Sequence, residues 1–311
     1  MGNIYNDITE TIGHTPLVRL NRIGADLGAE FLVKLESFNP MGSLKDRIGL
    51  AMIEKAEKDG LISKGGKIVE ATSGNTGISL AFVCAAKGYH LVLTMPENMS
   101  IERRKLLQLL GAEVVLTPAI YGMKGAIDIA EKRVKQDGNS FMPSQFANPA
   151  NPDIHACTTA EEILSDTDNK LDVLVAGVGT GGSLTGITRR IKQDLPNLTA
   201  VGVEPANSAV LSGGMPGPHL IQGIGAGFIP PVLDLELIDK IVDISDQTAV
   251  ETAQLCAKDE GIACGISSGA AVAAALKLAK EPEHRNSRFV IILPDFAERY
   301  FSTPLFMQDS E

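Results

Sequence analysis

A lysine lies in the stretch NPMGSLKDR, between the apolar run EFLVKLE and the helical pattern IGLAMIEKAEKDG. Ser43 and Asp46 have the S-x-x-D spacing of a capping box, so Lys45 is predicted in the first turn of a helix. The helix dipole disfavours a positive charge at that end. The ordinary interpretation is a solvated ammonium on a curled stem. A covalent role requires a carbonyl partner and a site that keeps the amine reactive.

A glycine-rich turn follows an apolar run in LDVLVAGVGTGGSLTGITRRI. Gly177, Gly179 and Gly182 satisfy G-x-G-x-x-G, and Glu204 follows 22 residues after Gly182. This is the pattern of a dinucleotide fingerprint. Because glycines let backbone N–H groups approach a phosphate at a helix N-terminus, the turn predicts an anion site without specifying the anion. A tight turn that only closes the packing is the alternative.

Two further turns place polar side chains at the start of helical patterns. The stretch EATSGNTGISLAF offers four of them, Thr72, Ser73, Asn75 and Thr76. Beside free helix N–H groups they suit a small carboxylate or a phenolic oxygen, and an ordinary capped turn is the alternative. In CGISSGAAVAAALKLA, Ser267 and Ser268 open an Ala-rich helix. They are typical of N-caps, and a hydroxyl directed into a cleft is the functional alternative.

Short apolar runs alternate with longer helical patterns along the chain. Strands are expected at Phe31–Leu35, Lys67–Ala71, His90–Met95, Glu113–Thr117, Leu171–Gly177, Thr199–Glu204 and Phe289–Pro294. Helices are expected at Ser43–Lys58, Thr76–Lys87, Ile101–Leu110, Lys124–Gln136, Asp153–Leu164, Ser183–Asp194, Thr248–Asp259 and Ser268–Ala279. This alternation, with continuously apolar strands, predicts an α/β fold whose parallel sheets are covered by helices on both faces.

Composition excludes several classes of function. The 311 residues carry a formal net charge of -10 and no basic run, which argues against nucleic-acid binding. No uncharged apolar run approaches the length of a membrane span, and the N-terminus lacks the apolar region of a signal peptide. Four scattered cysteines predict a reduced, cytoplasmic chain, and five scattered histidines predict no metal site.

The four polar or glycine-rich turns all fall at strand carboxyl ends or helix N-termini. Parallel α/β sheets bind their ligands at these places. A nucleophilic lysine, a phosphate cradle, a carboxylate-binding turn and a hydroxyl together predict pyridoxal 5'-phosphate (PLP) acting on an amino acid.

At this point the chain resembles the β-family, fold-type-II PLP enzymes, and most closely the cysteine synthases (O-acetylserine sulfhydrylases, A type). The resemblance runs through TIGHTPLVRLNRIG, NPMGSLKDR, TSGNTGISLA, MPENMSIERRKLLQLLGAEVVLT, NPANPDIH, GVGTGGSLTG, GPHLIQGIGAGFIP, GISSGAAVAAALKLA and ILPDFAERYFST. It implies two doubly wound domains with mainly parallel sheets, the tryptophan synthase β-like fold. A smaller, mobile substrate-binding subdomain is expected over 40–148, and a larger PLP-phosphate-binding domain over 1–39 and 149–311.

The resemblance also assigns roles by position. Lys45 matches the Schiff-base lysine, and Asn75 matches the residue that binds the cofactor's ring oxygen. Ser267 matches the hydroxyl facing the pyridine nitrogen, with Ser268 the less favoured neighbour. The phosphate loop matches Gly179, Thr180, Gly181, Gly182 and Ser183. The group that holds the substrate carboxylate matches Thr72, Ser73, Thr76 and Gln145, and a loop at the site entrance matches Gly223–Phe228.

The implied reaction makes L-cysteine and acetate from O-acetyl-L-serine and sulfide through an α-aminoacrylate intermediate. Lys45 is then the general base at Cα. A neutral serine hydroxyl at the pyridine nitrogen does not favour its protonation as a carboxylate would, which suits elimination and replacement at Cβ. The resemblance further implies a homodimer, and the C-terminal tail of a serine acetyltransferase as a possible partner.

Two alternatives stay open. One is a related β-replacement enzyme, either a cystathionine β-synthase or a sulfhydrylase that uses O-phosphoserine or thiosulfate. The other is an NAD-dependent oxidoreductase, which rests on Gly177–Gly182 and Glu204 and leaves Lys45 and Ser267 unexplained. The chain also departs from the family, which commonly has Gly before ERY, because it carries Phe296 and Ala297 there. These residues are expected to alter packing near the cofactor ring or a glycine-type φ angle.

Overall fold

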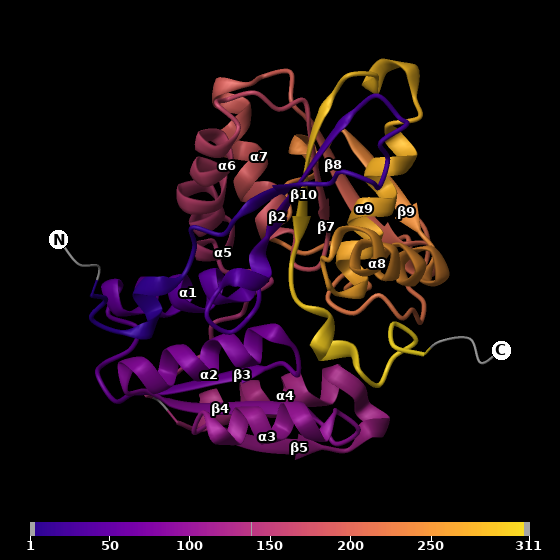
Figure 1. Ribbon diagram of the computed structural model, residues 1–311. Coiled ribbons are helices and arrows are strands. Elements are labelled where there is room, and N and C mark those ends of the chain that lie inside the picture. Colours follow the sequence, from indigo (N-terminus) through magenta and orange to yellow (C-terminus); the bar gives the residue numbers. More distant parts are fainter. Residues whose placement is uncertain (1–3, 138, 308–311) are drawn as a thin grey trace. The chain divides into compact units, whose positions relative to one another are not determined.

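The protein is described by a computed structural model that covers residues 4–137 and 139–307, and the chain divides into two compact units (Figure 1). The first unit comprises Met1–Ile12 and Lys45–Ala150, and the second comprises Gly13–Leu44 and Asn151–Glu311. The chain therefore passes from the second unit into the first at the peptide bond before Lys45.

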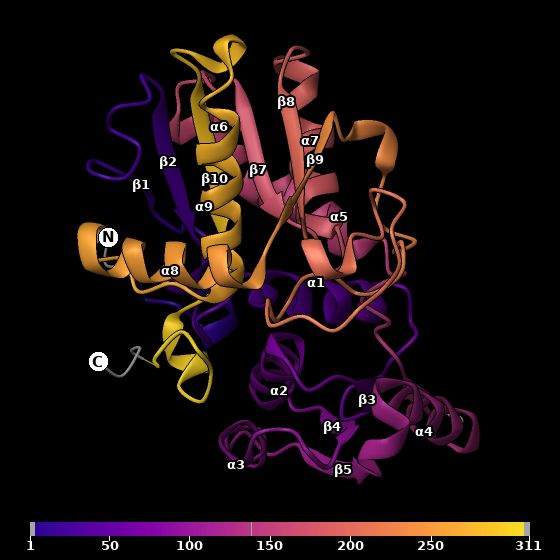
Figure 2. The ribbon, with the colours of Figure 1, turned by 90° about the vertical axis from the view of Figure 1, so that its right-hand side faces the viewer.

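The first unit contains a four-stranded parallel sheet in the order β5-β4-β3-β6. Its strands are β3 (Lys67–Ala71), β4 (His90–Pro96), β5 (Glu113–Thr117) and β6 (Ser140–Phe141). Its helices are α1 (Lys45–Lys58), α2 (Asn75–Lys87), α3 (Ile101–Leu109) and α4 (Gly122–Gln136). Helix α4 covers one face of the sheet and α2 and α3 cover the other, while α1 packs on α2 (Figure 2).

The second unit contains a six-stranded sheet in the order β1-β2-β10-β7-β8-β9, in which only the β1–β2 pair is antiparallel. Its strands are β1 (Leu17–Arg19), β2 (Glu30–Leu35), β7 (Val173–Gly177), β8 (Thr199–Pro205), β9 (Lys240–Ile244) and β10 (Arg288–Leu293). Its helices are α5 (Ala150–Ile154), α6 (Ala160–Asp166), α7 (Gly182–Asp194), α8 (Asp246–Glu260) and α9 (Ile266–Leu278).

Alternate residues of β7 enter two different cores of the second unit. Val173 and Val175 pack with residues of α8 and α9, whereas Leu174 and Ala176 pack with residues of α6 and α7. Since successive strand side chains point to opposite faces, helices cover both faces of this sheet. The predicted fold class, α/β with doubly wound, mainly parallel sheets, is confirmed.

Each sheet has a point at which the order of the strands reverses. In the first unit the chain runs outward from β3 to β5, and β6 then pairs with the other side of β3. In the second unit the chain runs outward from β7 to β9, and β10 then pairs with the other side of β7. The loops that leave such neighbouring strands diverge and open a crevice at their carboxyl ends, which is where doubly wound sheets bind ligands.

Every predicted strand is present, and the boundaries differ by at most two residues. Three strands were not predicted, namely β1, β6 and β9. The helix predicted over Asp153–Leu164 is interrupted by a π-helical segment, His155–Thr159, between α5 and α6. Within the described residues, no helix is long and apolar enough to cross a membrane.

Candidate active site

The turn at residues 72–76, called the substrate turn below, lies directly after β3 at the strand-order reversal of the first unit's sheet. Thr72 and Thr76 are buried, and the Thr72 Oγ1 accepts a hydrogen bond from the Gly74 N–H (3.3 Å). Helix α2 begins at Asn75, and its N-cap residue, Gly74, supplies no side-chain cap. The turn therefore combines hydroxyl groups with backbone N–H groups at the positive end of a helix, which suits an anionic ligand.

Gln145 comes from the loop that follows β6, on the other side of the same strand-order reversal. Its Oε1 accepts a 2.6 Å hydrogen bond from the Thr76 hydroxyl, and both side chains are buried. The structure thus brings together the four residues predicted to hold a substrate carboxylate, although they come from two loops 69 residues apart.

Lys45 is the first residue of α1 and is partly buried between Leu44 and Asp46, which are both buried. Its carbonyl oxygen accepts a 2.7 Å hydrogen bond from the Ser79 hydroxyl of α2. The two helices approach closely here, since a Cβ on Gly49 would lie 2.0 Å from the Ser79 Oγ. The first turn of α1 is therefore fixed against the helix that begins at the substrate turn.

The helix that carries Lys45 begins two residues later than predicted. Ser43 forms a β-bridge with Asp295, and the Leu44 N–H donates to the Pro294 carbonyl (2.9 Å). The bridge pairs the Ser43 backbone with a distant segment, so the helix does not start at Ser43 as the capping box implied. These two contacts also anchor the segment before Lys45 at the end of β10, one of the two strands at the reversal of the second unit's sheet.

The glycine-rich turn follows β7, the other strand at that reversal. Gly181 is the N-cap of α7 with φ +80°, a conformation that favours glycine. A Cβ on Gly179 would lie 2.2 Å from the Gly223 carbonyl oxygen, and one on Gly182 would lie 1.9 Å from the Asn151 Oδ1. The first turn of α7 contains no acidic residue, so the positive end of this helix fits a phosphate. These residues fit the phosphate group of PLP.

Asn151 supports this turn and was not predicted. Its Nδ2 donates to the Thr180 Oγ1 (3.0 Å), which also accepts from the Gly182 N–H (3.3 Å). The available signal was an asparagine in the stretch NPANPDIH, just before the helix predicted from Asp153. The predicted entrance loop, Gly223–Phe228, is also adjacent, since the Gly225 N–H donates to the Val178 carbonyl (3.0 Å).

The two serines of the third turn do not cap their helix. The N-cap of α9 is Gly265, so Ser267 and Ser268 lie inside the first turn and the capping interpretation is wrong. The Cys256 side chain and burial raise the pKa of the Cys264 thiol, and the Ser268 hydroxyl beside it lowers that pKa. Ser267 precedes Ser268 by about 100° around the helix, so its buried hydroxyl points in another direction.

Glu204 does not serve as the ribose ligand of a dinucleotide site. Its buried carboxylate accepts hydrogen bonds from the Leu211 N–H (2.8 Å), the Ser212 N–H (3.0 Å) and the Ser212 hydroxyl (2.6 Å). Both oxygens are therefore engaged in fixing the following turn. The NAD-dependent alternative loses the residue on which it rested.

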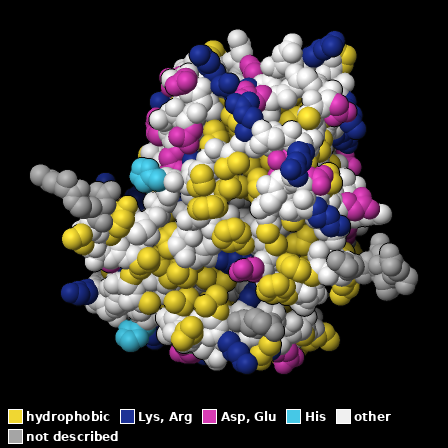
Figure 3. Space-filling view, in the orientation of Figure 1, with side chains coloured by type: hydrophobic (Ala, Val, Ile, Leu, Met, Phe, Trp, Pro, Cys, Tyr) yellow, Lys and Arg dark blue, Asp and Glu magenta, His cyan; other side chains and the backbone are white. Residues whose placement is uncertain are grey.

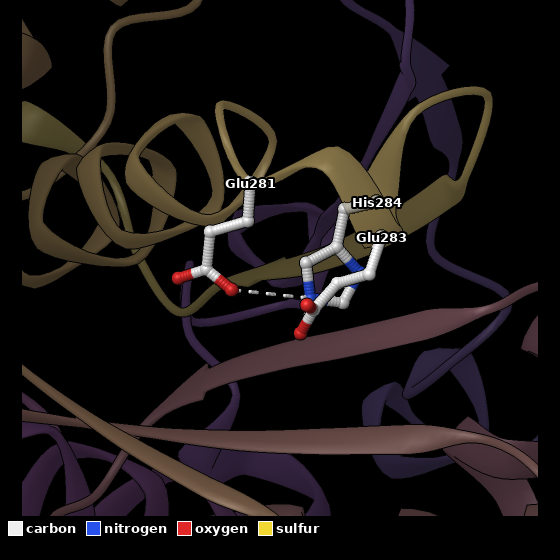
Figure 4. Close-up of side chains that lie close together, drawn as sticks. All are labelled: Glu281, Glu283 and His284. Atoms are coloured by element: carbon white, nitrogen blue, oxygen red, sulfur yellow. Dashed lines mark ion pairs between the residues drawn. The ribbon is translucent and has the colours of Figure 1, made fainter.

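Glu281, Glu283 and His284 offer ligand atoms within 4.8 Å of one another (Figure 4). The Lys240 ammonium lies among them, 2.8 Å from a carboxylate oxygen of each glutamate. The side-chain hydrogen bonds to Glu281 and Glu283 raise the pKa of Lys240. The Lys240 ammonium therefore supplies the positive charge that a metal ion would otherwise bring to these two carboxylates.

Phe296 and Ala297, which stand before ERY where the family commonly has glycine, have a local structural effect. Phe296 is partly exposed and packs on Phe38, with ring centroids 6.1 Å apart. Ala297 begins a 3-10 helix, Ala297–Tyr300, and neither Phe296 nor Ala297 has the positive φ that glycine favours. The Phe296 side chain is therefore the substantive difference.

Comparison with known proteins identifies the family. The family described as "Pyridoxal-phosphate dependent enzyme" matches residues 8–295. Cysteine synthase A of Salmonella typhi is 56% identical over 98% of this chain and 97% of its own length. The crystal structure of a cysteine synthase from Entamoeba histolytica superposes with a TM-score of 0.96 at 45% identity, covering 99% of this chain and 93% of that one.

A third relative is an O-ureido-L-serine synthase, whose structure superposes with a TM-score of 0.94 at 44% identity and covers 99% of this chain and 98% of that one. Similarity of this extent covers both units and all the turns described above. The chain belongs to the pyridoxal-phosphate dependent enzymes and, within them, to the cysteine synthase family.

Proposed function

We propose that the protein makes L-cysteine and acetate from O-acetyl-L-serine and sulfide. The observation that carries this proposal is the 56% identity to a cysteine synthase A over 98% of the chain. The geometry supports it, because each unit places a fitting anion-binding turn at the strand-order reversal of its sheet.

We assign one group of residues to the cofactor and another to the substrate. Gly179, Thr180, Gly181, Gly182 and Ser183 hold the PLP phosphate. Ser267 faces the ring nitrogen, Asn75 contacts the ring oxygen, and Lys45 is the attachment point. Thr72, Ser73, Thr76 and Gln145 hold the carboxylate of the amino acid. We also propose the two domains that the family resemblance implies. Residues 40–148 form the domain that binds the substrate and closes over it, and residues 1–39 and 149–311 form the domain that binds the cofactor.

When bound, PLP withdraws electrons from Cα of the amino acid and so makes its proton acidic. The Lys45 amine takes that proton, the Cβ–O bond breaks, and acetate leaves with the bonding electrons. Hydrosulfide then forms the S–Cβ bond, and Lys45 returns the proton to Cα. The Ser79 hydrogen bond to the Lys45 carbonyl and the packing of α1 on α2 limit the positions from which the amine acts.

The direct test is turnover by the purified, PLP-loaded protein. We expect cysteine and acetate in equal amounts when O-acetylserine and sulfide are both present. Formation of neither product would contradict the proposal.

One structural neighbour is named for a different product, O-ureido-L-serine. The related alternatives, namely cystathionine formation and the use of O-phosphoserine or thiosulfate, are therefore compared in the same assay. We expect kcat/KM to be highest for O-acetylserine with sulfide. A higher kcat/KM for O-phosphoserine would instead assign the protein to the sulfhydrylases that use O-phosphoserine.

We further propose a cytoplasmic homodimer. The unpaired state of Cys84, Cys157, Cys256 and Cys264 is typical of a reducing compartment. The first unit carries exposed apolar side chains on the face seen in Figure 3, and its Leu109 and Ile120 are 83% and 87% exposed. Exposed apolar surface of this kind favours association, which sedimentation equilibrium measures. A monomer at micromolar concentration would contradict the dimer.

The C-terminal tail of a serine acetyltransferase is the proposed regulatory partner. Its terminal carboxylate matches the chemistry of the turn at Thr72–Thr76, so the tail and O-acetylserine compete for one place. Capture of the protein by the immobilised tail is expected to weaken as O-acetylserine is added. Capture that is indifferent to O-acetylserine would contradict binding at this turn.

A further inference from the structure

Glu70 is a buried carboxylate at the end of a strand whose other residues are mostly apolar. It lies in β3, two residues before Thr72, and is only 4% exposed. Val69 and Ala71 pack with α4, so Glu70 points to the opposite face of the sheet. A carboxylate in such surroundings is costly unless hydrogen-bond donors surround it.

The donors come from the two loops that form the substrate half of the site. The Glu70 Oε2 accepts from the Ser144 N–H (2.8 Å), and Oε1 accepts from the Ala71 N–H (3.1 Å). The backbone N–H of Gln145 also hydrogen-bonds this carboxylate. One side chain of β3 therefore holds the loop after β6 against the start of the loop after β3.

This hydrogen bonding fixes an unfavourable backbone conformation. Ser144 has φ +53°, in the left-handed region that residues other than glycine rarely adopt. Such a conformation persists only where its surroundings enforce it. Directly after it, the Gln145 side chain reaches Thr76 and accepts the 2.6 Å hydrogen bond. The orientation of Gln145 thus depends on a strained residue whose N–H Glu70 holds.

We propose that Glu70 is a positioning residue for substrate binding: through the backbone of Ser144 and Gln145, it sets the Gln145 side chain that receives the amino acid's carboxylate. The inference rests on the proposed function, in which Gln145 and Thr76 bind that carboxylate. Glu70 itself touches neither substrate nor cofactor in this role.

The electrostatics agree with a role that packing alone does not explain. Burial raises the pKa of the Glu70 carboxyl to about 7, although the N–H groups of Ser144, Ala71 and Gln145 lower it. An apolar side chain at position 70 would fill the same space without the cost of burying an ionisable carboxyl group. Groups whose ionisation is unfavourable are characteristic of functional sites.

Glu70→Gln is the informative variant, because it preserves volume but replaces one acceptor oxygen with a donor that faces a backbone N–H. We expect kcat/KM for O-acetylserine to fall about tenfold, the effect of one buried donor left without a partner. We expect kcat/KM for sulfide to change by less than about threefold, since in a ping-pong reaction each ratio reports its own half-reaction.

A double-mutant cycle tests whether Glu70 acts through Gln145. If it does, Glu70→Gln added to Gln145→Ala lowers kcat/KM for O-acetylserine by clearly less than it does alone. Glu260→Gln is the matched control, because its carboxylate also accepts three backbone N–H groups, from Asn21, Arg22 and Ile23. That variant is expected to leave both ratios unchanged.

The outcomes separate this inference from the proposed function. A wild-type protein that does not make cysteine contradicts the function itself. A functional wild type whose Glu70→Gln variant loses nothing, or loses both ratios equally, or shows additive effects with Gln145→Ala, overturns the positioning role. If Glu70→Gln does not fold, Glu70→Asp is measured in its place; its shorter carboxylate is expected to give the same unequal loss, and an equal loss overturns the proposal.

Discussion

The hydroxyl of Thr76 and the side-chain oxygen of Gln145 are joined by a 2.6 Å hydrogen bond between the first turn of α2 and the loop after β6. The bond spans the strand-order reversal of the first unit's sheet, where the chain runs outward from β3 on one side and returns as β6 on the other. It turns two separate loops into one polar surface.

Removing the Thr76 hydroxyl is expected to weaken substrate capture. Thr76→Val keeps the shape of the side chain but leaves the Gln145 Oε1 without this donor, so kcat/KM for O-acetylserine falls by about tenfold or more. Thr76→Ser retains the hydroxyl and should stay within about threefold of wild type. Steady-state kinetics checks both variants, and equal values for Thr76→Val and wild type would contradict the assignment.

Replacing Lys45 is expected to abolish most of the activity. Lys45→Ala removes the amine proposed to carry PLP and to move the Cα proton, and general acid–base catalysis alone contributes about 100- to 10,000-fold. Turnover should therefore fall by at least about 1,000-fold. Lys55→Ala, on the same helix and paired with Asp59 at the surface, is the control and should be fully active. Near-normal turnover by Lys45→Ala would remove the basis of the mechanism.

Gly182→Ala is expected to impair PLP binding as well as stability. The new Cβ would lie 1.9 Å from the Asn151 Oδ1, in the proposed phosphate turn. Gly186→Ala, one turn later in α7, would meet the Pro152 carbonyl at 2.0 Å but lies outside that turn. Each overpacked site should lose about 1–3 kcal/mol of stability in the apo protein. Only Gly182→Ala should also lose PLP on gel filtration, and equal retention by both variants would contradict the phosphate assignment.

The stability of the protein should depend on pH through Glu70. Burial raises the pKa of this carboxyl from 4.5 to about 7, so between these values the folded state binds more protons than the unfolded state. The stabilisation is complete below pH 4.5 and is lost as the pH rises through 7. Glu70→Gln lacks this contribution, which is roughly 3 kcal/mol. Urea unfolding of both proteins at pH 5 and pH 8 measures the difference, and parallel pH profiles would contradict it.

Much of the fold could be predicted because strong local patterns agreed with the tertiary structure. The run KIVEA ends where β3 ends, and α2 follows the turn that its polar residues indicated. The strand β6 has only Ser140 and Phe141, which is too short for a periodic pattern to show. The start of α1 was displaced because Ser43 pairs with Asp295, a contact with a residue more than 250 positions away.

The site was predictable only as a set of turns. Sequence spacing identified Thr76, and resemblance to a family identified Gln145, but neither indicated the hydrogen bond between them. Glu70 was passed over as part of an apolar strand, although a carboxylate at that place was itself a signal. Its role depends on the left-handed φ of Ser144, and a serine in a loop does not by itself predict that conformation.

The most direct test of the central claim, that this chain catalyses β-replacement on O-acetylserine with PLP held at Lys45, is a visible absorption titration of the PLP-loaded protein. Addition of O-acetylserine without sulfide is expected to shift the cofactor's band and release one acetate per site, and sulfide is expected to restore the original band with formation of one cysteine. Lys45→Ala should show neither the acetate release nor the restoration. A band that O-acetylserine leaves unchanged in the wild-type protein would contradict the claim.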